Sequence, residues 1–424
     1  MPMDNLWEKT AVSPPATKIL ASAQSTYDLV VIGAGFSGCS AAITARDLGA
    51  SVAVFEAKTV GYGGSGRNVG LVNAGLWTPP DEIEATIGKR EGTHLYECLS
   101  AAPDQVFSLI DRLNIECQAR RNGTLHCAHA TSGLSDLKNR MKQLRARGAP
   151  VELLDAHATS HRVGSERFKG ALFDPRAGTI QPLSYVRGLA KEAMKAGADL
   201  FENAPVHHVK KTSSGWMVSV GDQVVFAKAL LLATNAYLHG LTGLPAPQFT
   251  KVGYFQAATR PLEPTWQRSI LQNKEGCWDT ALVMSSFRMD GEGRLVIGGV
   301  GSLESLGRGA HLAWAQRKLA LLFPQLAKEQ LQEAWSGVIC MTGDHIPKIQ
   351  EIGAKGYALF GYSGRGIGPG TVFGATAAKA LLTGDRQDLP VVPTKAHREH
   401  LTGLKQVYYE AGATLTHLTA ARGP

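Results

Sequence analysis

The chain has 424 residues, 44% hydrophobic and 19% charged, a composition typical of a globular protein with room for two domains. No apolar stretch reaches the roughly 20 residues that span a bilayer, and six cysteines without a C-x-x-C pair or zinc spacing predict reduced thiols in a cytoplasmic protein. The net charge is +8, but the densest basic run, residues 138–147, alternates with apolar residues at helical spacing. This pattern favours a solvated helix face over a nucleic-acid-binding patch. The next explanation for the positive net charge is that it attracts acidic or carboxylate-bearing substrates.

A strand, a glycine-rich turn, a helix and a second strand follow one another in residues 27–56. Residues 27–32 form a β-branched apolar run typical of a buried parallel strand. The next six residues, 33–38, read G-x-G-x-x-G, and small and apolar residues at helical spacing follow. A second apolar strand, residues 52–55, ends on Glu56. This setting predicts dinucleotide binding rather than a purely structural glycine turn.

Each residue type in this motif has a physical role. Gly33 allows the tight turn, Gly35 lets the backbone approach a pyrophosphate, and Gly38 lets the helix pack closely on the strand. The helix N-terminus offers free N–H groups and a partial positive charge to phosphates. Glu56 is placed to accept hydrogen bonds from an adenosine ribose, which favours an unphosphorylated 2′-hydroxyl.

Two further glycine-rich segments indicate which dinucleotide is bound. Residues 61–70 follow Glu56 closely, and residues 357–370 read as a strand that runs into a glycine cluster before a small-residue helix at 371–382. In a flavin, the ribityl chain and ring extend beyond the pyrophosphate and need protein backbone close to them. The N-terminus of the helix at 371–382 could face the pyrimidine end of the flavin ring. The alternative is two ordinary flexible loops, but both adjoin predicted elements of the parallel sheet, which favours the flavin.

The chain as a whole predicts an α/β fold (α+β overall), in which a Rossmann-like FAD-binding domain is interleaved with a substrate domain built on an antiparallel sheet. Residues 1–25 are predicted to be a loose arm without a secretory signal. The FAD-binding domain is predicted at 26–85, 150–248 and 335–390, the substrate domain at 86–149 and 249–334, and a C-terminal helical tail at 391–424. Helices are expected at 93–113, 134–147, 182–197, 311–323 and 395–410, a strand pair near 116–128, and antiparallel strands at 252–260, 281–289 and 294–299.

Five further segments, taken in order, carry a family resemblance. They are residues 65–68, 233–237, 287–288 with 298–299, 342–347 and 364–370. With these segments the chain resembles the D-amino-acid-oxidase superfamily of FAD-dependent amine oxidoreductases, which includes glycine oxidase and monomeric sarcosine oxidase. Within it, the chain is most similar to the gamma-glutamylputrescine oxidase-like branch. The resemblance extends over roughly residues 27–385 and is much more specific than any one motif.

The resemblance implies FAD as the cofactor. Val206 would hold the adenine through its backbone, while Ala233 and Thr234 would pass near the cofactor. The residues expected to bind FAD are Gly33, Gly35, Phe36, Ser37, Gly38, Glu56, Ala57, Gly64, Ser65, Gly66, Arg67, Asn68, Val69, Gly70, Leu71, Val206, Ala233, Thr234, Gly364, Arg365, Gly366, Ile367, Gly368, Pro369, Gly370 and Thr371.

The resemblance also implies the reaction. The substrate would be an amine or amino acid, and hydride would move from the carbon next to nitrogen to flavin N5. The imine would hydrolyse, and oxygen or another acceptor would reoxidise the flavin. Because the chemistry belongs mainly to the cofactor, most of the acceleration is expected from positioning and desolvation, and no catalytic triad is expected.

Four residues are candidates for the substrate pocket. Arg365, inside the late glycine cluster, could polarise the flavin or hold a carboxylate, or it could be a surface arginine. Arg288 could clamp a carboxylate or form a salt bridge at the rim. Tyr254, with Phe255, could wall the pocket, although strand aromatics more often lie in a core. His345 could be a base or a flavin neighbour, or a structural histidine.

The chain departs from the family's pattern at several positions. Residues 69–71 read Val-Gly-Leu where the branch has Gly-Gly-Gln, which leaves the substrate open. Val296 stands where sarcosine oxidase-like members carry an oxygen-activating lysine, so the resemblance does not imply that oxygen reoxidises the reduced flavin rapidly. Cys340 resembles the cysteine that tethers FAD in some relatives, but its offset from residue 344 is shorter, which favours non-covalent FAD. His397 and His400 lie one helical turn apart without a third ligand, so no metal is expected.

Two other classes of function remain open from the sequence. One is an FAD-dependent enzyme acting on modified RNA, because related folds act on tRNA bases and the chain is basic. A basic stripe interleaved with stacking aromatics is missing, which makes nucleic-acid binding the weaker hypothesis. The other is a non-catalytic flavin-binding subunit of a larger complex, against which the intact flavin loops and the large second domain argue.

Overall fold

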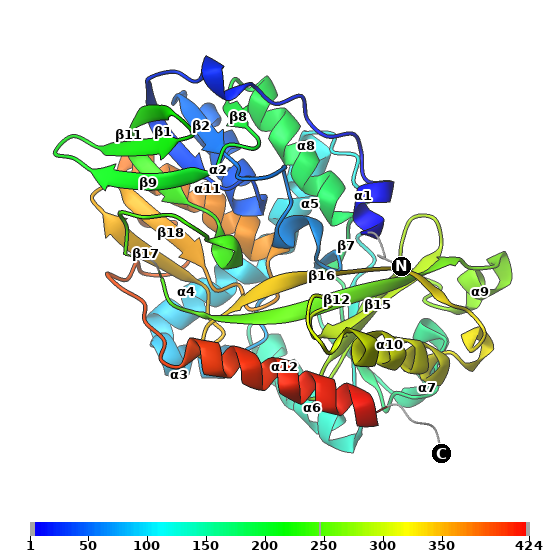
Figure 1. The fold of residues 1–424 in the computed structure, drawn as a ribbon. Coiled ribbons are helices and arrows are strands. Elements are labelled where there is room, and N and C mark those ends of the chain that lie inside the picture. Colours follow the sequence, from blue (N-terminus) through cyan, green and yellow to red (C-terminus); the bar gives the residue numbers. More distant parts are fainter. Residues whose placement is uncertain (1–4, 246, 421–424) are drawn as a thin grey trace.

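The computed structural model describes residues 5–245 and 247–420, which form two eight-stranded sheets with helices around them (Figure 1). The first sheet contains β1 (Thr26–Ile32), β2 (Val52–Phe55), β8 (Asp199–Phe201), β9 (Val206–Lys211), β10 (Trp216–Val220), β11 (Gln223–Leu232), β17 (Lys348–Gly353) and β18 (Gly356–Phe360). The second sheet contains β4 (Thr124–Cys127), β5 (Glu152–Leu154), β6 (Ala171–Asp174), β12 (Thr250–Pro261), β13 (Gly276–Asp279), β14 (Ser285–Met289), β15 (Arg294–Val300) and β16 (Leu331–Met341). A small pair joins β3 (Leu71–Val72) to β7 (Gly178–Thr179).

The helices fall between these strands along the chain. They are α1 (Leu6–Thr10), α2 (Phe36–Asp47), α3 (Pro80–Ile87), α4 (Lys89–Ser100), α5 (Ala102–Arg112), α6 (Thr131–Ala146), α7 (Ala156–Val163), α8 (Pro182–Lys195), α9 (Pro264–Ser269), α10 (Arg308–Leu322), α11 (Ile367–Thr383) and α12 (Thr402–Thr419). The expected mixed α/β architecture is confirmed, and the two strand systems are interleaved in the sequence.

The first sheet is covered on both faces, which explains its continuous apolar strands. Strands β8, β2, β1, β11 and β18 run parallel in that order. In β1, Leu29 and Val31 belong to the core shared with α2, α8 and α11, while Val30 and Ile32 belong to the core under β9 and β10. The carboxyl ends of β1, β2 and β11 therefore meet at one edge of the sheet, where ligands of such folds bind.

The second sheet forms a roof over that edge. Its order is β16-β12-β15-β14-β13-β4-β6-β5, and most neighbours are antiparallel, with β13 and β4 parallel. Side chains alternate along β12: Phe255 and Ala257 pack in the core beneath α10, while Tyr254 and Gln256 face the other way. The roof is thus apolar toward α10 and more polar toward the first sheet.

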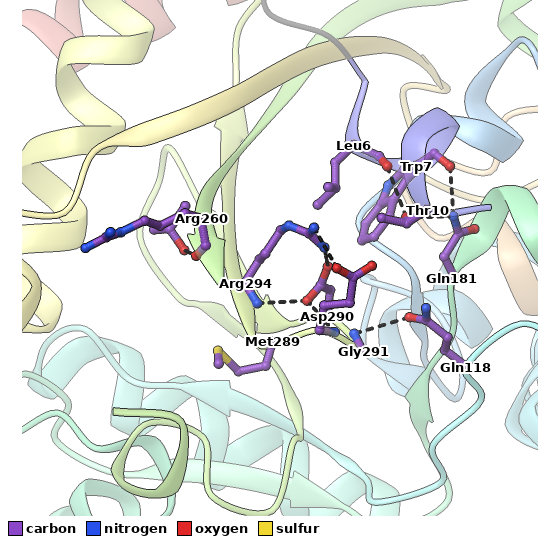
Figure 2. Close-up of polar contacts among 12 residues, drawn as sticks. Leu6, Trp7, Thr10, Gln118, Gln181, Arg260, Met289, Asp290, Gly291 and Arg294 are labelled. Carbon is purple, nitrogen blue, oxygen red and sulfur yellow. Dashed lines mark hydrogen bonds and ion pairs between the residues drawn. The ribbon is translucent and has the colours of Figure 1, made fainter. Parts of the chain in front are cut away.

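The N-terminal segment is packed against the body of the protein, so the prediction of a loose arm is wrong for the described residues. Leu6 and Trp7 of α1 are fully buried, and Trp7 Nε1 donates a hydrogen bond to the carbonyl of Asn68 at 2.8 Å. Gln181 Nε2 donates to the carbonyl of Trp7 at 2.9 Å and to Thr10 Oγ1 at 3.2 Å (Figure 2). Composition did not reveal this docking because it depends on contacts with residues more than 60 positions away.

Several boundaries differ from those predicted. Residues 152–154 and 171–174 (β5 and β6) and residues 335–341, the larger part of β16, belong to the second sheet, not to the nucleotide-binding sheet. The predicted strand pair near 116–128 contains one strand, β4, which pairs with β6 and β13 instead of a sequence neighbour. The predicted helix at 93–113 is two helices, α4 and α5, broken at Ala101. These differences arise because strand partners are chosen by tertiary contacts.

The C-terminal helix lies later than predicted, at α12 instead of 395–410, and packs against α10 and β12 (Figure 1). Two buried histidines fasten it: His417 Nδ1 and His311 Nδ1 lie 2.8 Å apart, and His311 Nε2 lies 3.0 Å from Glu410 Oε1. Burial lowers the pKa of His417 to about 3, aided by its neighbour His311, so His417 is neutral at physiological pH. The short contact needs one imidazole nitrogen to accept a hydrogen bond from the other, and neutral His417 can serve as donor or acceptor.

Candidate functional site

A cavity of about 450 Å³ lies between the carboxyl ends of the first sheet and the roof. Its walls come from segments far apart in the sequence, which the fold brings together. The predicted cofactor residues that line it are Gly33, Gly35, Phe36, Ser37, Glu56, Ala57, Gly64, Ser65, Arg67, Asn68, Val69, Leu71, Val206, Ala233, Thr234, Gly364, Gly366 and Ile367. The volume is that of a ligand site.

The first glycine turn has the geometry that the motif requires. Gly33 adopts a φ of +105°, a conformation that side chains oppose. A Cβ built on Gly38 would lie 1.9 Å from the carbonyl oxygen of Gly33, so only glycine lets α2 approach β1 this closely. Gly38 therefore supports the turn from behind, whereas Gly35 faces the cavity beside Ser65.

Glu56 directly follows β2 and lines the cavity. Its carboxylate accepts hydrogen bonds from the backbone N–H groups of Ala34 and Lys58, both at 2.9 Å. Burial raises the pKa of Glu56, and these two hydrogen bonds oppose the shift. The carboxylate thus holds the glycine turn in place as well as facing the cavity.

The second glycine segment wraps one side of the cavity. Ser65 Oγ accepts from the N–H of Phe36 at 3.0 Å, which joins this loop to the first turn. Arg67 donates from Nε to the carbonyl of Tyr62 at 2.7 Å and from Nη1 to that of Ser336 at 3.0 Å. Asn68 closes the loop on itself by donating to the carbonyls of residues 64 and 65. Gly66 lies behind the cavity wall, where a Cβ would meet the carbonyl of residue 61 at 2.4 Å.

The late glycine cluster forms both a wall and a helix start. Helix α11 begins at Ile367, four residues earlier than predicted, so Gly368, Pro369, Gly370 and Thr371 form its first turns. These residues are buried, and α11 packs closely on α2. They aim the N-terminus of α11 at the cavity but do not line it.

The roof presents one row of side chains along paired strands. The register places Gln256 of β12 beside Gly298 of β15, Gly298 beside Ser286 of β14, and Ser286 beside Trp278 of β13. Tyr254 donates its hydroxyl to Ser286 Oγ at 3.0 Å. Gly298 leaves the gap in this row: a Cβ there would lie 2.3 Å from Gln256 Oε1.

Gln256 was missed by the sequence reasoning, although its spacing from Tyr254 signals the same face of the strand. The side chain is 1% exposed and lines the cavity, and neither amide atom has a hydrogen-bond partner among the described residues. A buried amide without partners is costly, so it indicates a ligand group or water in the cavity. Trp77, Asn73, Trp278, Met284, Ser286 and Val300 also line the cavity and carried no motif.

Two of the four predicted pocket residues line the cavity. Tyr254 is on the roof, and His345, at a φ of +55°, lies on the loop after β16. Phe255 is fully buried in the core beside His311 and Trp314, so it does not wall the pocket. Because successive residues of a strand point to opposite faces, Tyr254 faces the cavity and Phe255 faces the core.

Arg288 is neither a carboxylate clamp at the cavity nor part of a salt bridge at the rim. Its side chain is 1% exposed, and Nη1 donates to the carbonyls of Gly70 at 3.0 Å and Ile180 at 2.5 Å. Its guanidinium lies 5.6 Å from the ring of Trp7, and burial lowers its pKa to about 10. Arg288 thus ties the roof to the second glycine loop, and Gly70 leaves room for it.

Arg365 is buried, so it is not a surface arginine, and its side chain points away from the main cavity. It lines a smaller cavity beyond Trp77 and Trp278, whereas the adjacent Gly364 and Gly366 line the large one. Cys340 lines the large cavity, and burial raises the pKa of its thiol. Val296 is fully buried and does not line the cavity.

Among residues 5–245 and 247–420, no group of three or more His, Cys, Asp or Glu side chains could hold a metal ion. Within the same ranges, no helix is long and apolar enough to cross a membrane.

Comparison with known proteins agrees with this geometry. Residues 28–380 match the family model described as FAD dependent oxidoreductase (DAO). The chain is 29% identical over 384 residues to a probable oxidoreductase, OrdL, of Haemophilus influenzae, covering 88% of this chain and 86% of that protein. It is 28% identical to the gamma-glutamylputrescine oxidoreductase of Escherichia coli, with 85% of each chain covered. The crystal structure of glycine oxidase from Geobacillus kaustophilus superposes with a TM-score of 0.70 at 20% identity, covering 85% of this chain and 96% of that one.

Proposed function

Because this chain belongs to the DAO family of FAD-dependent oxidoreductases, which act on amines or amino acids, we propose that it oxidises an amine bound between the cofactor and the roof. The cofactor is bound without a covalent link. The observation that carries the proposal is the amide of Gln256, which is buried, without partners and on the cavity wall. Such a group is suited to orient a polar substrate.

The residues of the cavity fit FAD. The glycine turn at 33–38 and the N-terminus of α11 offer backbone N–H groups to anionic or electron-rich parts of the cofactor. Gly35 and Gly63 present bare backbone to the cavity. A side chain would not fit at either position, because its Cβ would lie 2.8 Å from Ser65 Oγ at position 35 and 2.9 Å from the Tyr237 ring at position 63. Glu56 lines the cavity and would accept a hydrogen bond from a ribose hydroxyl.

When bound, FAD supplies the acceptor for a hydride from the carbon next to nitrogen. The chain's own residues position the substrate and exclude water. The roof residues that line the cavity carry no net charge: they are Val252, Tyr254, Gln256, Trp278, Met284, Ser286, Val300, Gly337, Val338, Ile339, Cys340 and Met341. An ammonium group would lose its hydration there without gaining a carboxylate, so the roof favours the neutral amine.

We expect one class of amine to bleach the bound flavin during anaerobic titration. The panel contains primary, secondary and N-acylated amines and amino acids, and the readout is the flavin band near ~450 nm. Admitting air afterwards separates an oxidase from a dehydrogenase. A protein that stays yellow with every compound, and that instead retains RNA or a partner subunit, would refute the proposal.

Replacing Gln256 with Leu is expected to raise KM for the identified substrate by about 10-fold, because one buried hydrogen bond is worth roughly 1–1.5 kcal/mol. The stability of the holoprotein should not fall, since the change removes a buried amide that has no partner. Steady-state kinetics and thermal unfolding provide the two readouts. Gln223→Leu, on β11 and remote from the cavity, is the matched control. An unchanged KM in Gln256→Leu would show that the amide does not contact the substrate.

A further inference from the structure

A second cavity, of about 40 Å³, lies beside the main one, against the same face of the roof. Trp278 and Asn73 line both cavities, so the two are neighbours. Arg365, Arg140 and His126 also line the small cavity. Its volume accommodates roughly three water-sized groups, at about 10–15 Å³ for each. A carboxylate group, with three heavy atoms, or a single halide matches this space.

The Arg365 guanidinium has only part of its hydrogen-bonding capacity used. Nη1 donates to the carbonyls of Ala74 at 3.1 Å and Gly75 at 3.2 Å, and Nε has no partner among the described residues. The side chain is 8% exposed, and its guanidinium carbon lies 4.5 Å from the ring of Trp77 and 5.3 Å from that of Trp278. Burial, with the charge of Arg140, lowers the pKa of Arg365 to about 9, so the group is still cationic at pH 7.

Arg140 brings a second cation to the same cavity. It extends from α6 and donates to the carbonyl of Trp77. Burial and these two guanidinium groups hold the pKa of His126 well below its ordinary value, so His126 is neutral. Its ring stacks on Trp278 at 5.1 Å.

No carboxylate of the described residues forms a direct hydrogen bond with either arginine. Asp174 is the one acid that lines the small cavity, and Arg176 holds it with two hydrogen bonds, from Nε at 2.9 Å and Nη2 at 2.6 Å. Neither Arg365 nor Arg140 forms an ion pair with an acid in residues 5–245 or 247–420. Asp174 attracts Arg365, and Glu82 and Asp136 attract Arg140, without an ion pair to either guanidinium. The two guanidinium groups also repel each other and lose hydration, a situation that an anion bound between them relieves.

From this geometry we infer that the cavity between Arg365 and Arg140 binds a small carboxylate or a similar monovalent anion. The ligand is either a free anion or the carboxylate of a substrate that reaches past Trp278. This anion site is separate from the proposed amine oxidation, and anion binding can be measured without turnover. It requires no change in the main cavity or its glycine turns.

Sodium formate is the probe, titrated into the FAD-loaded protein by calorimetry at constant ionic strength. We expect saturable binding and a rise in Tm, and weakening by about 10-fold or more in Arg365→Gln and in Arg140→Gln, since each removes a charge-assisted donor. Arg268→Gln, an exposed arginine on α9, is the matched control and should bind formate as the parent does. Arg140 is only half-buried, so its variant provides the test if Arg365→Gln fails to fold.

Competition then identifies the natural occupant. If an amino acid displaces formate while the matching amine without a carboxylate does not, the substrate's carboxylate occupies the cavity. If neither displaces it, the site holds a free anion. The inference is overturned if the parent protein shows no saturable formate binding, or if both arginine variants bind formate as tightly as the parent. Flavin bleaching by an amine is independent of either result.

Discussion

Gly38→Ala is expected to yield a protein that does not retain FAD. The new Cβ would lie 1.9 Å from the carbonyl oxygen of Gly33 and 3.3 Å from Val31 Cγ1. A backbone carbonyl at a φ of +105° cannot move aside as a flexible side chain could. The first turn of α2 would therefore shift away from β1, and the N–H groups that face the cavity would shift with it.

The added methyl group overpacks a site where the backbone cannot yield. Adding a methyl group to a well-packed site typically lowers the free energy of unfolding by about 1–3 kcal/mol and sometimes more. The variant should be purified in the presence of FAD, then desalted and measured for the ratio of flavin to protein absorbance and for Tm. Gly412→Ala is the matched control, because this helical glycine in α12 has no atom within 4 Å of the built Cβ. The control should keep its flavin and gain up to about 1 kcal/mol in stability. A yellow Gly38→Ala protein with stoichiometric flavin would contradict the assigned role of this glycine.

The sequence was most informative where structure is local. The turn at Gly33 could be predicted because strand, turn, helix and acid all lie within 30 residues, and each residue type has a steric reason. The N-terminus of α11 was predicted in the same way, with its start misplaced because glycines suggested a loop where α2 packs against a helix. Small residues close to another helix are a packing signal as well as a loop signal.

Side-chain direction was the part that the sequence did not contain. Arg288 and Arg365 were both placed in the right segments, yet each points away from the main cavity, toward carbonyl groups from distant parts of the chain. Gln256 could have been inferred from Tyr254 two residues earlier, because alternate residues of a strand share a face. Its lack of partners, which makes it significant, depends on Gly298 and Ser286 in neighbouring strands.

The N-terminal helix shows the same limit most clearly. Residues 1–25 have the composition of an arm, but Trp7 is fully buried beneath the second glycine loop. Its ring meets Trp335 edge-on at 5.4 Å, and Trp335 Nε1 donates to the carbonyl of Arg67 at 3.0 Å. Two tryptophans thus hold consecutive carbonyls of that loop, at Arg67 and Asn68. Helix α1 is therefore part of the wall behind the cofactor cavity, which no local pattern signals.

Trp7→Ala should accordingly lower the free energy of unfolding by about 3–5 kcal/mol, the usual range for truncating a buried aromatic. FAD affinity should fall as well, because the carbonyl of Asn68 loses its donor and the loop loses its support. Trp7→Phe keeps the ring but not the hydrogen bond, so a smaller loss of about 1 kcal/mol is expected. Urea unfolding and FAD titration of the apoprotein measure the two effects.

Lys9→Ala tests whether Trp7 itself, and not α1 in general, carries the effect. Lys9 lies on the same short helix and pairs with Glu333 at 2.8 Å, with 47% of its side chain exposed. Exposed pairs contribute about 0–1 kcal/mol, so this variant should keep both stability and FAD affinity close to those of the parent. Equal behaviour of Trp7→Ala and Lys9→Ala would mean that the N-terminal helix is a dispensable cover. A large difference would establish that the loop facing the cofactor is held in place by a residue some 60 positions upstream of it.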